Sequence, residues 1–258
     1  MENKKVTSLE VAKLAGVSQS AVSRVFTPGA SSSKKTNELV RNAAKELGYR
    51  PNILARSLIT GRSRIIGLVV AYLDNYFYPE ALELLSSALQ KKGYHVLVFM
   101  AAKTAGNIDD IVDEILDYQV DGIIAASVAM SSELATRCGA AGVPIVLFNR
   151  TQDDKRLSAV TSDNILGGRK VAEFLIATGH SKIGYISGWE GASTQRDREK
   201  GFKDELIRNQ LSIFSREVGN FNSDEARQAA RRMFTGEEIP DAVFVANDDM
   251  AFAVMDVI

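Results

Sequence analysis

From Ile65 onward the chain alternates short apolar runs with amphipathic stretches, and this alternation restricts the fold more than any other feature. Apolar runs of this kind suit strands that are buried on both faces of a parallel sheet. They occur at Ile65–Val70, Val96–Met100, Gly122–Ala126, Pro144–Phe148, Lys182–Ser187 and Ala242–Ala246. Helical spacing between them predicts helices at Pro79–Lys92, Ile108–Tyr118, Glu133–Ala141, Leu166–Thr178, Gln195–Asn209 and Asp224–Phe234. Strands and helices that alternate in this way predict βαβ units, and therefore doubly wound α/β sheets.

The segment before these runs, Thr7 to Leu58, has a different pattern, which predicts short helices. Thr7 and Glu10 have the spacing of a capping box, and Gly16 can take the positive φ at which a first helix ends. Ser18 can cap a second helix. The apolar stripes expected to pack these helices are Leu9, Val11, Ala12 and Leu14 in the first and Ala21, Val22 and Val25 in the second. The pattern predicts a helix-turn-helix, although a plain helical hairpin fits it too.

The second predicted helix presents short polar side chains and one guanidinium on its outer side. They are Ser18, Gln19, Ser20, Ser23 and Arg24. Such groups can read base edges and phosphates in the major groove of DNA. A third helix is predicted from the cap Ser33 to Leu47, with Leu39, Val40, Ala43, Ala44 and Leu47 as its apolar side. Hydroxyls at its start, including Ser33 and Thr36, lie where free N–H groups favour a phosphate.

Charge is divided unevenly along the chain. Residues 1–64 hold 12 Lys and Arg against 4 Asp and Glu, whereas the remainder holds 19 against 28. A basic segment that coincides with a helix-turn-helix favours contact with a polyanion such as nucleic acid. The alternative is a basic face that is merely solvated.

A short aliphatic segment, Ile53–Leu58, follows the break at Pro51 and can be capped by Asn52. A helix of this length is marginal in isolation, so we expect it to need a partner helix, a DNA groove, or both. We predict four parts: a DNA-binding headpiece over 1–50, a hinge helix and linker over 51–63, and two sub-domains of an α/β body over 64–161 and 162–258.

Polar and aromatic side chains follow the predicted strands of the body. Ligands of doubly wound sheets bind in the crevice beyond the carboxyl ends of the strands. The chain places there the segments 73–79, Ser127, Asn149–Arg150, Ser187–Trp189 and Asn247–Asp249. Hydrogen-bonding groups beside aromatic faces suit a small polyol such as a sugar. The alternative is that these residues only cap helices and terminate loops.

The sequence holds no pattern that favours catalysis, a cofactor or a metal. Neither His95 nor His180 has partners at metal-ligand spacing, and no phosphate-binding glycine motif follows a strand. We therefore expect no enzyme, no cofactor and no metal site. Cys138 is the only cysteine, which fits a reducing compartment. A signal peptide and a membrane-spanning run are not apparent, so we expect a soluble cytoplasmic protein without membrane contact.

From about Val6 to its last residue the chain resembles the LacI/GalR family of bacterial transcription regulators. The headpiece sequence TSLEVAKLAGVSQSAVSRV carries the resemblance, followed by LGYRPN and ILARSL. The body continues in family order with IIGLVV, FYPEAL, KKGYHV, DGIIA, PIVLFNR, SDNILGG, GHSKIGYISG, REKGF and VFVANDDMA. The resemblance implies a helix-turn-helix headpiece, a hinge helix and a body like the periplasmic binding proteins. It also implies a homodimer on a palindromic operator, associated with the nucleoid and controlled by a small effector.

The resemblance also implies which positions contact DNA and effector. Ser18, Gln19, Ser20 and Arg24 match positions that read the major groove, and Thr7, Ser33, Thr36 and Asn52 match phosphate contacts. Leu58, with Ala55 beside it, matches the leucine inserted into the minor groove. In the body, the effector positions are Phe77, Tyr78, Ser127, Asn149, Arg198, Phe221 and Asn247. Arg198 would donate to ligand hydroxyls or a carboxylate, unless it is a surface charge of its helix.

The chain departs from the family pattern in its last residues. The sequence reaches Ile258 just after the Asn-Asp motif, where family members continue. We therefore expect an incomplete second sub-domain, whose Met250, Phe252, Val254, Met255 and Ile258 face solvent or a partner. A regulator shortened in this way could bind DNA weakly or not at all. A sugar-binding module without a DNA role is the other alternative.

Overall fold

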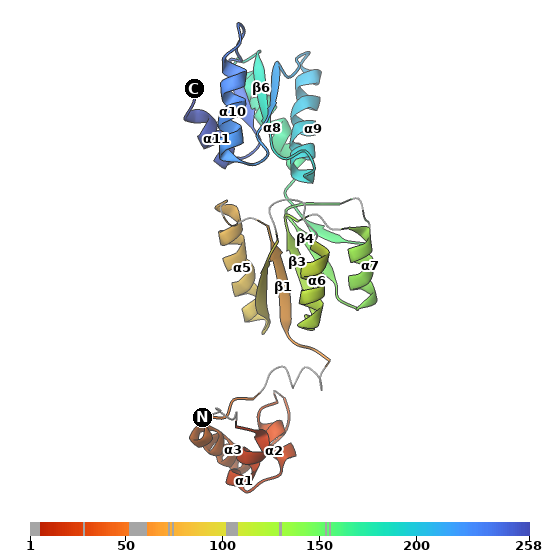
Figure 1. The fold of residues 1–258 in the computed structure, drawn as a ribbon, viewed down its shortest axis with the longest axis vertical. Coiled ribbons are helices and arrows are strands. Elements are labelled where there is room, and N and C mark those ends of the chain that lie inside the picture. Colours follow the sequence, from red (N-terminus) through yellow and green to blue (C-terminus); the bar gives the residue numbers. More distant parts are fainter. Residues whose placement is uncertain are drawn as a thin grey trace. The chain divides into compact units, whose positions relative to one another are not determined.

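The computed structural model describes residues 6–27, 29–51, 61–71, 73, 75–101, 108–128, 131–152, 154 and 156–258. The chain divides into two compact units, Met1–Ser63 and Arg64–Ile258 (Figure 1). No helix in the described ranges is long and apolar enough to cross a membrane.

The described residues of the first unit form the helices α1 (Ser8–Ala15), α2 (Gln19–Val25) and α3 (Lys34–Leu47). The expected capping box is present: the Thr7 backbone N–H donates to Glu10 Oε2 at 2.7 Å, and the Glu10 N–H donates to Thr7 Oγ1 at 3.4 Å. Gly16, at φ 64°, ends α1 in the left-handed conformation that glycine adopts without strain. The capping residues therefore set where α1 begins and ends.

A small core joins these helices, and it differs in part from the expected stripes. Val11, Val22 and Val40 are fully buried where the helices meet. Leu9, Leu14 and Leu39 are nearly half exposed, so their placement in the stripes was wrong. On α1 the buried side falls on Val11, Ala12 and Ala15, whose small side chains allow the helices to approach closely.

The second unit begins with a five-stranded parallel sheet in the order β2-β1-β3-β4-β5. Its strands are β1 (Ile65–Val70), β2 (His95–Met100), β3 (Gly122–Ala126), β4 (Ile145–Phe148) and β5 (Ser158–Val160). Its helices are α5 (Phe77–Lys91), α6 (Ile108–Asp117) and α7 (Ser132–Ala140), with α5 and α6 on opposite sides (Figure 1). Successive residues of β1 point to opposite faces of the sheet. Leu68 packs in one cluster with Tyr78 of α5, and Val69 packs in another with Ile115 of α6. We call this part the first lobe.

A second lobe is built on a three-stranded parallel sheet in the order β7-β6-β8. Its strands are β6 (Ile183–Ser187), β7 (Ser215–Val218) and β8 (Ala242–Val245), and its helices are α8 (Asn164–Ala177), α9 (Ser193–Arg208), α10 (Ser223–Phe234) and α11 (Asp248–Met255). Its core centres on Tyr185 and Phe202, whose rings stack at 5.6 Å. The two lobes therefore have separate hydrophobic cores.

Glycines bring α8 and α9 into backbone contact. A Cβ built on Gly168 would overlap the Arg198 carbonyl group, and one built on Gly201 would overlap the Ile165 carbonyl group. The two helices pack this closely only because both positions lack a side chain. The contact holds Arg198 of α9 beside Asn164, the first residue of α8.

All the helices and strands expected in the body are present, with ends that differ by at most two residues. Three further elements, β5, β7 and α11, were not predicted. Met250 and Val254 are buried against the second lobe, so the expectation that they face solvent or a partner was wrong. Phe252, Met255 and Ile258 are about two-thirds exposed, as expected.

Candidate functional site

The first part of the candidate site is the outer face of α2. Val22 and Val25 anchor the helix in the core, and this leaves Ser18, Gln19, Ser20 and Arg24 exposed. Ser18 Oγ accepts from the Ala21 N–H at 3.2 Å and lies 3.0 Å from Ser20 Oγ. Gln19 Nε2 donates to Ser8 Oγ of α1 at 2.9 Å. Short hydrogen-bonding side chains thus cluster at the N-terminus of an exposed helix.

The predicted phosphate positions lie at the starts of the other two helices. Ser33 Oγ accepts from the Thr36 N–H at 3.1 Å and lies 2.8 Å from Thr36 Oγ1. Thr7 holds the equivalent place on α1. Helix N-termini carry partial positive charge, and the neighbouring Lys34 and Lys35 are exposed. The predicted contacts Asn52, Ala55 and Leu58 lie outside the described residues.

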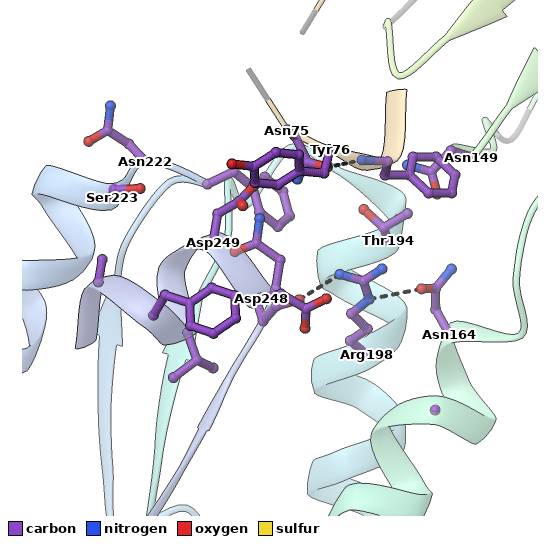
Figure 2. Close-up of a pocket in the computed structure, with 18 of the residues that line it drawn as sticks. Asn75, Tyr76, Asn149, Asn164, Thr194, Arg198, Asn222, Ser223, Asp248 and Asp249 are labelled. Carbon is purple, nitrogen blue, oxygen red and sulfur yellow. Dashed lines mark hydrogen bonds between the residues drawn. The ribbon is translucent and has the colours of Figure 1, made fainter. Parts of the chain in front are cut away.

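The second part is a cleft of about 1160 Å³ in the body, lined by residues of both lobes. Loops at the carboxyl ends of the strands supply much of its lining, as the strand-end rule predicts. Figure 2 shows Arg198 reaching into this cleft beside Asn164, with Asn75, Tyr76 and Asp249 gathered at the top of the view. Six of the seven predicted effector positions line it: Phe77, Tyr78, Asn149, Arg198, Phe221 and Asn247.

Ser127, the seventh predicted effector position, is not among the lining residues and is 1% exposed. It lies behind the cleft wall, where its hydroxyl is hydrogen-bonded to Tyr78 Oη. Asn149 Nδ2 donates to both groups, at 2.9 Å to Tyr78 Oη and 3.1 Å to Ser127 Oγ. Ser127 therefore supports two residues of the wall and is not itself part of the cleft lining.

Three of the predicted effector positions have a strained backbone. Ser127 (φ 57°), Asn149 (φ 69°) and Phe221 (φ 56°) are in the left-handed region, which residues other than glycine seldom adopt. Ser127 directly follows β3 and Asn149 directly follows β4. Strain of this kind is concentrated at functional sites, where the surrounding structure enforces it.

Aromatic rings form two apolar patches in the cleft. Phe77 stacks on Phe148 with centroids 5.8 Å apart and meets Tyr78 edge-on at 5.2 Å. Phe221 of the second lobe lies directly over Gly188, so closely that a Cβ on Gly188 would overlap its ring. The cleft thus offers a ring face from each lobe to a flat or cyclic ligand.

Arg198 is the cationic group that projects into the cleft from α9. Its Nε donates to Asn164 Oδ1 at 2.9 Å, and its Nη1 donates to the Ala246 carbonyl at 2.5 Å. Burial lowers the pKa of this guanidinium from its usual high value, but arginine remains protonated in proteins. These contacts hold the side chain in one orientation. Arg198 is thus not one of the solvated charges of α9.

Several lining residues were not chosen as site residues from the sequence. Asn75, Asn164, Asp248 and Asp249 all line the cleft. The sequence could have indicated these residues, because each follows a strand or begins a helix within a group of polar residues. Asn247 lines the cleft and also caps α11, since its Oδ1 accepts from the Met250 N–H at 3.0 Å. In the described part of the chain, no three His, Cys, Asp or Glu side chains are grouped as metal ligands.

Comparison with protein families accounts for both parts of the site. Residues 8–52 match the model described as "Bacterial regulatory proteins, lacI family", and residues 66–258 match a "Periplasmic binding protein domain". The HTH-type transcriptional regulator CelR of Thermobifida fusca is 31% identical over 268 residues, covering 100% of this chain and 78% of CelR. The chain belongs to the lacI family.

Other lacI-family proteins align over nearly all of the chain. The HTH-type transcriptional repressor PurR of Vibrio atlanticus is 30% identical over 252 residues, which are 96% of this chain and 75% of that repressor. The crystal structure of the lac repressor dimer bound to operator and an anti-inducer superposes with a TM-score of 0.88 at 29% identity, covering 98% of this chain and 77% of that one. The chain is thus a LacI-type transcription regulator, and relatives of this kind are repressors rather than enzymes.

Proposed function

We propose that this regulator binds a palindromic operator as a homodimer in the cytoplasm, and that a small polyol in the cleft sets its operator affinity. One observation carries the proposal: a helix-turn-helix with an exposed polar face occurs in the same chain as a cleft lined by an oriented arginine and by aromatic rings of both lobes. The first feature suits DNA recognition, and the second suits a small ligand.

For DNA, we assign base reading to Ser18, Gln19, Ser20 and Arg24 on α2. An exposed amide can make bidentate contacts to adenine, and a guanidinium can make them to guanine. Thr7, Ser33 and Thr36 would hold phosphates at the starts of α1 and α3. Asn52, Ala55 and Leu58 remain proposed backbone and minor-groove contacts on the strength of family resemblance.

For the effector, we assign hydrogen bonding to Arg198, Asn149 and Asn247, and ring contact to Phe77, Tyr78 and Phe221. Alternating donors, acceptors and aromatic faces fit the hydroxyls and the apolar face of a sugar. The CelR–cellobiose complex, a solved structure 29% identical to this chain with a TM-score of 0.68, supports a sugar as the class of ligand.

Effector and operator would be coupled by a linkage of ordinary size, about 1–3 kcal/mol. Ligand binding between the lobes would change their relative angle, and the hinge segments of two chains would carry that change to the DNA-binding helices. Linkage requires that operator binding alter effector affinity by the same factor.

Site selection from random duplex DNA by the purified full chain tests the DNA assignment. We expect a palindromic consensus. In Gln19→Ala, we expect the binding preference for the consensus base at the positions that Gln19 reads to change by about 1–3 kcal/mol per base pair. Lys45→Ala is the control, because Lys45 lies in the last turn of α3 and its loss should leave the consensus unchanged. An identical consensus for Gln19→Ala would refute the role of Gln19. No consensus from the unmodified chain would favour a ligand-binding module without a DNA role, or a shortened, inactive regulator.

A further inference from the structure

A side-chain hydrogen bond joins the two lobes across the cleft, between the segment that precedes α5 and the start of α11. Asn75, which precedes α5 in the first lobe, donates from Nδ2 to Asp249 Oδ2 in the second lobe at 2.7 Å. These two residues are 174 positions apart in sequence, and both are partly shielded from solvent. Figure 2 shows them together on one side of the cleft, whereas Asn149 and Asn164 lie on the other side. We call the pair the clasp.

Each member of the clasp has a favourable place in its own lobe. Asn75 Oδ1 accepts from the Phe77 N–H at 2.9 Å, and the Asn75 carbonyl accepts from the Tyr78 N–H at 3.1 Å. Asp249 lies in the first turn of α11, where the helix dipole favours a carboxylate. Because the side-chain oxygen of Asn75 accepts from the start of α5, its Nδ2 is directed to the other lobe. The Asn75 amide is therefore already oriented for the clasp by its own lobe.

Among the described residues, further contacts between the lobes are made by the segment that follows β4. The Thr151 N–H donates to Ser193 Oγ at the start of α9, at 2.8 Å. The Arg150 guanidinium lies 5.3 Å from the ring centroid of Trp189, which follows β6 in the second lobe. This part of the cleft lies where the chain passes from one lobe to the other, so the lobes stay joined here when they separate at the clasp, but their rotation about this point loosens the packing of Arg150 on the Trp189 ring. Opening of the cleft must therefore break the clasp.

We propose that Asn75 and Asp249 are positioning residues that fix the width of the closed cleft around the effector. The inference rests on the proposed function, since it assigns the same cleft to a ligand held between the lobes. A hydrogen bond to a carboxylate is among the stronger side-chain bonds, so its loss should shift the ratio of closed to open molecules on the order of tenfold to hundredfold. The clasp thereby sets what fraction of molecules is open for a ligand to enter.

Trp189 provides a built-in reporter, because it is the only tryptophan of the chain and its ring stacks on a side chain of the other lobe. In Asn75→Asp, a carboxylate faces Asp249 and repels it, while the new oxygen can still accept from the Phe77 N–H and keep the start of α5. The double variant N75D/D249N exchanges the two groups and restores a hydrogen bond. In Asp249→Asn alone, the amide oxygen still accepts from Asn75.

The experiment measures acrylamide quenching and the emission maximum of Trp189 in the full chain at neutral pH. We expect greater quenching and a red shift in Asn75→Asp, near-normal values in Asp249→Asn, and recovery in the double variant. Unchanged quenching in Asn75→Asp would overturn the clasp. A change that the double variant does not reverse would also overturn it, because the cause would then be local damage to α5. Site selection with the same variants separates this result from the proposed function: a normal consensus beside unchanged quenching would refute the clasp alone.

Discussion

Two adjacent glycines of α8, Gly167 and Gly168, should respond to alanine in opposite directions. Gly168 is buried against α9, where a new Cβ would overlap the Arg198 carbonyl oxygen and lie only 2.9 Å from the Phe202 backbone nitrogen. Gly167 is exposed and would meet nothing within 4 Å. The substitution is chemically identical at both positions, so a difference between them measures the packing of α8 on α9 alone.

The expected magnitudes follow from two opposing effects. Replacing glycine by alanine inside a helix stabilises it by about 0.5–1 kcal/mol. At Gly167 this is the whole effect. At Gly168 the clash involves backbone atoms, which cannot move aside as a side chain does, and overpacking of a core costs about 1–3 kcal/mol. We expect Gly168→Ala to destabilise by about 2 kcal/mol, since the backbone clash places the cost near the upper end.

Thermal unfolding of the full chain checks this reasoning. For a body of this size, 1 kcal/mol shifts the Tm by about 2–4 °C, so Gly168→Ala should lower it by roughly 4–8 °C and Gly167→Ala should raise it slightly. Gly168→Ala should also weaken effector binding, because the displaced α9 carries Arg198 away from Asn164. Equal shifts of the same sign in both variants would show that helix propensity, and not close packing, governs these positions.

Two further predictions concern the second lobe. Hydrogen bonding from Arg216 holds the pKa of Glu199 below its usual value, so this pair stabilises the fold above pH about 4.5 and loses that contribution as the pH falls through the lower, folded pKa. Urea midpoints between pH 3 and 7 should therefore decline less steeply on the acid side in Glu199→Gln, and equal slopes would contradict the assignment. Gly188→Ala should cost about 1–3 kcal/mol by displacing the Phe221 ring, and this cost should largely vanish in a Phe221→Ala background. If thermal melts show the same cost with and without the ring, the contact between Gly188 and Phe221 is not what limits position 188.

Most strands and helices could be predicted from the sequence because burial imposes a readable pattern on them. The central strand β1 reads IIGLVV, and its apolar run coincides with its observed ends. The missed strands lie at sheet edges: Ser158–Val160 is exposed throughout, and Ser215–Val218 carries two charged residues. Backbone pairing defines these two strands, and backbone pairing leaves little trace in side-chain composition. On α1, helical spacing alone could not tell which side of the helix the core would use.

The candidate site was predicted in outline but not in its connections. Polar residues after strands indicated the cleft, because parallel strands end at one edge of a sheet. The resemblance placed Ser127 at a ligand position. In the structure its hydroxyl is hydrogen-bonded to Tyr78 Oη behind the cleft wall. No pattern in the sequence relates Asn75 to Asp249, since they belong to different lobes and meet only when both have folded. Contacts of this kind depend on tertiary geometry that local spacing does not encode.

The left-handed bends at Ser127, Asn149 and Phe221 restrict how such a cleft can acquire a new ligand. β-branched side chains are penalised at these torsions, whereas glycine and asparagine tolerate them. Laboratory evolution of altered ligand preference should therefore keep β-branched residues out of these three positions. Adaptive substitutions would accumulate instead on the helix-borne side chains around them, where the backbone accepts almost any replacement.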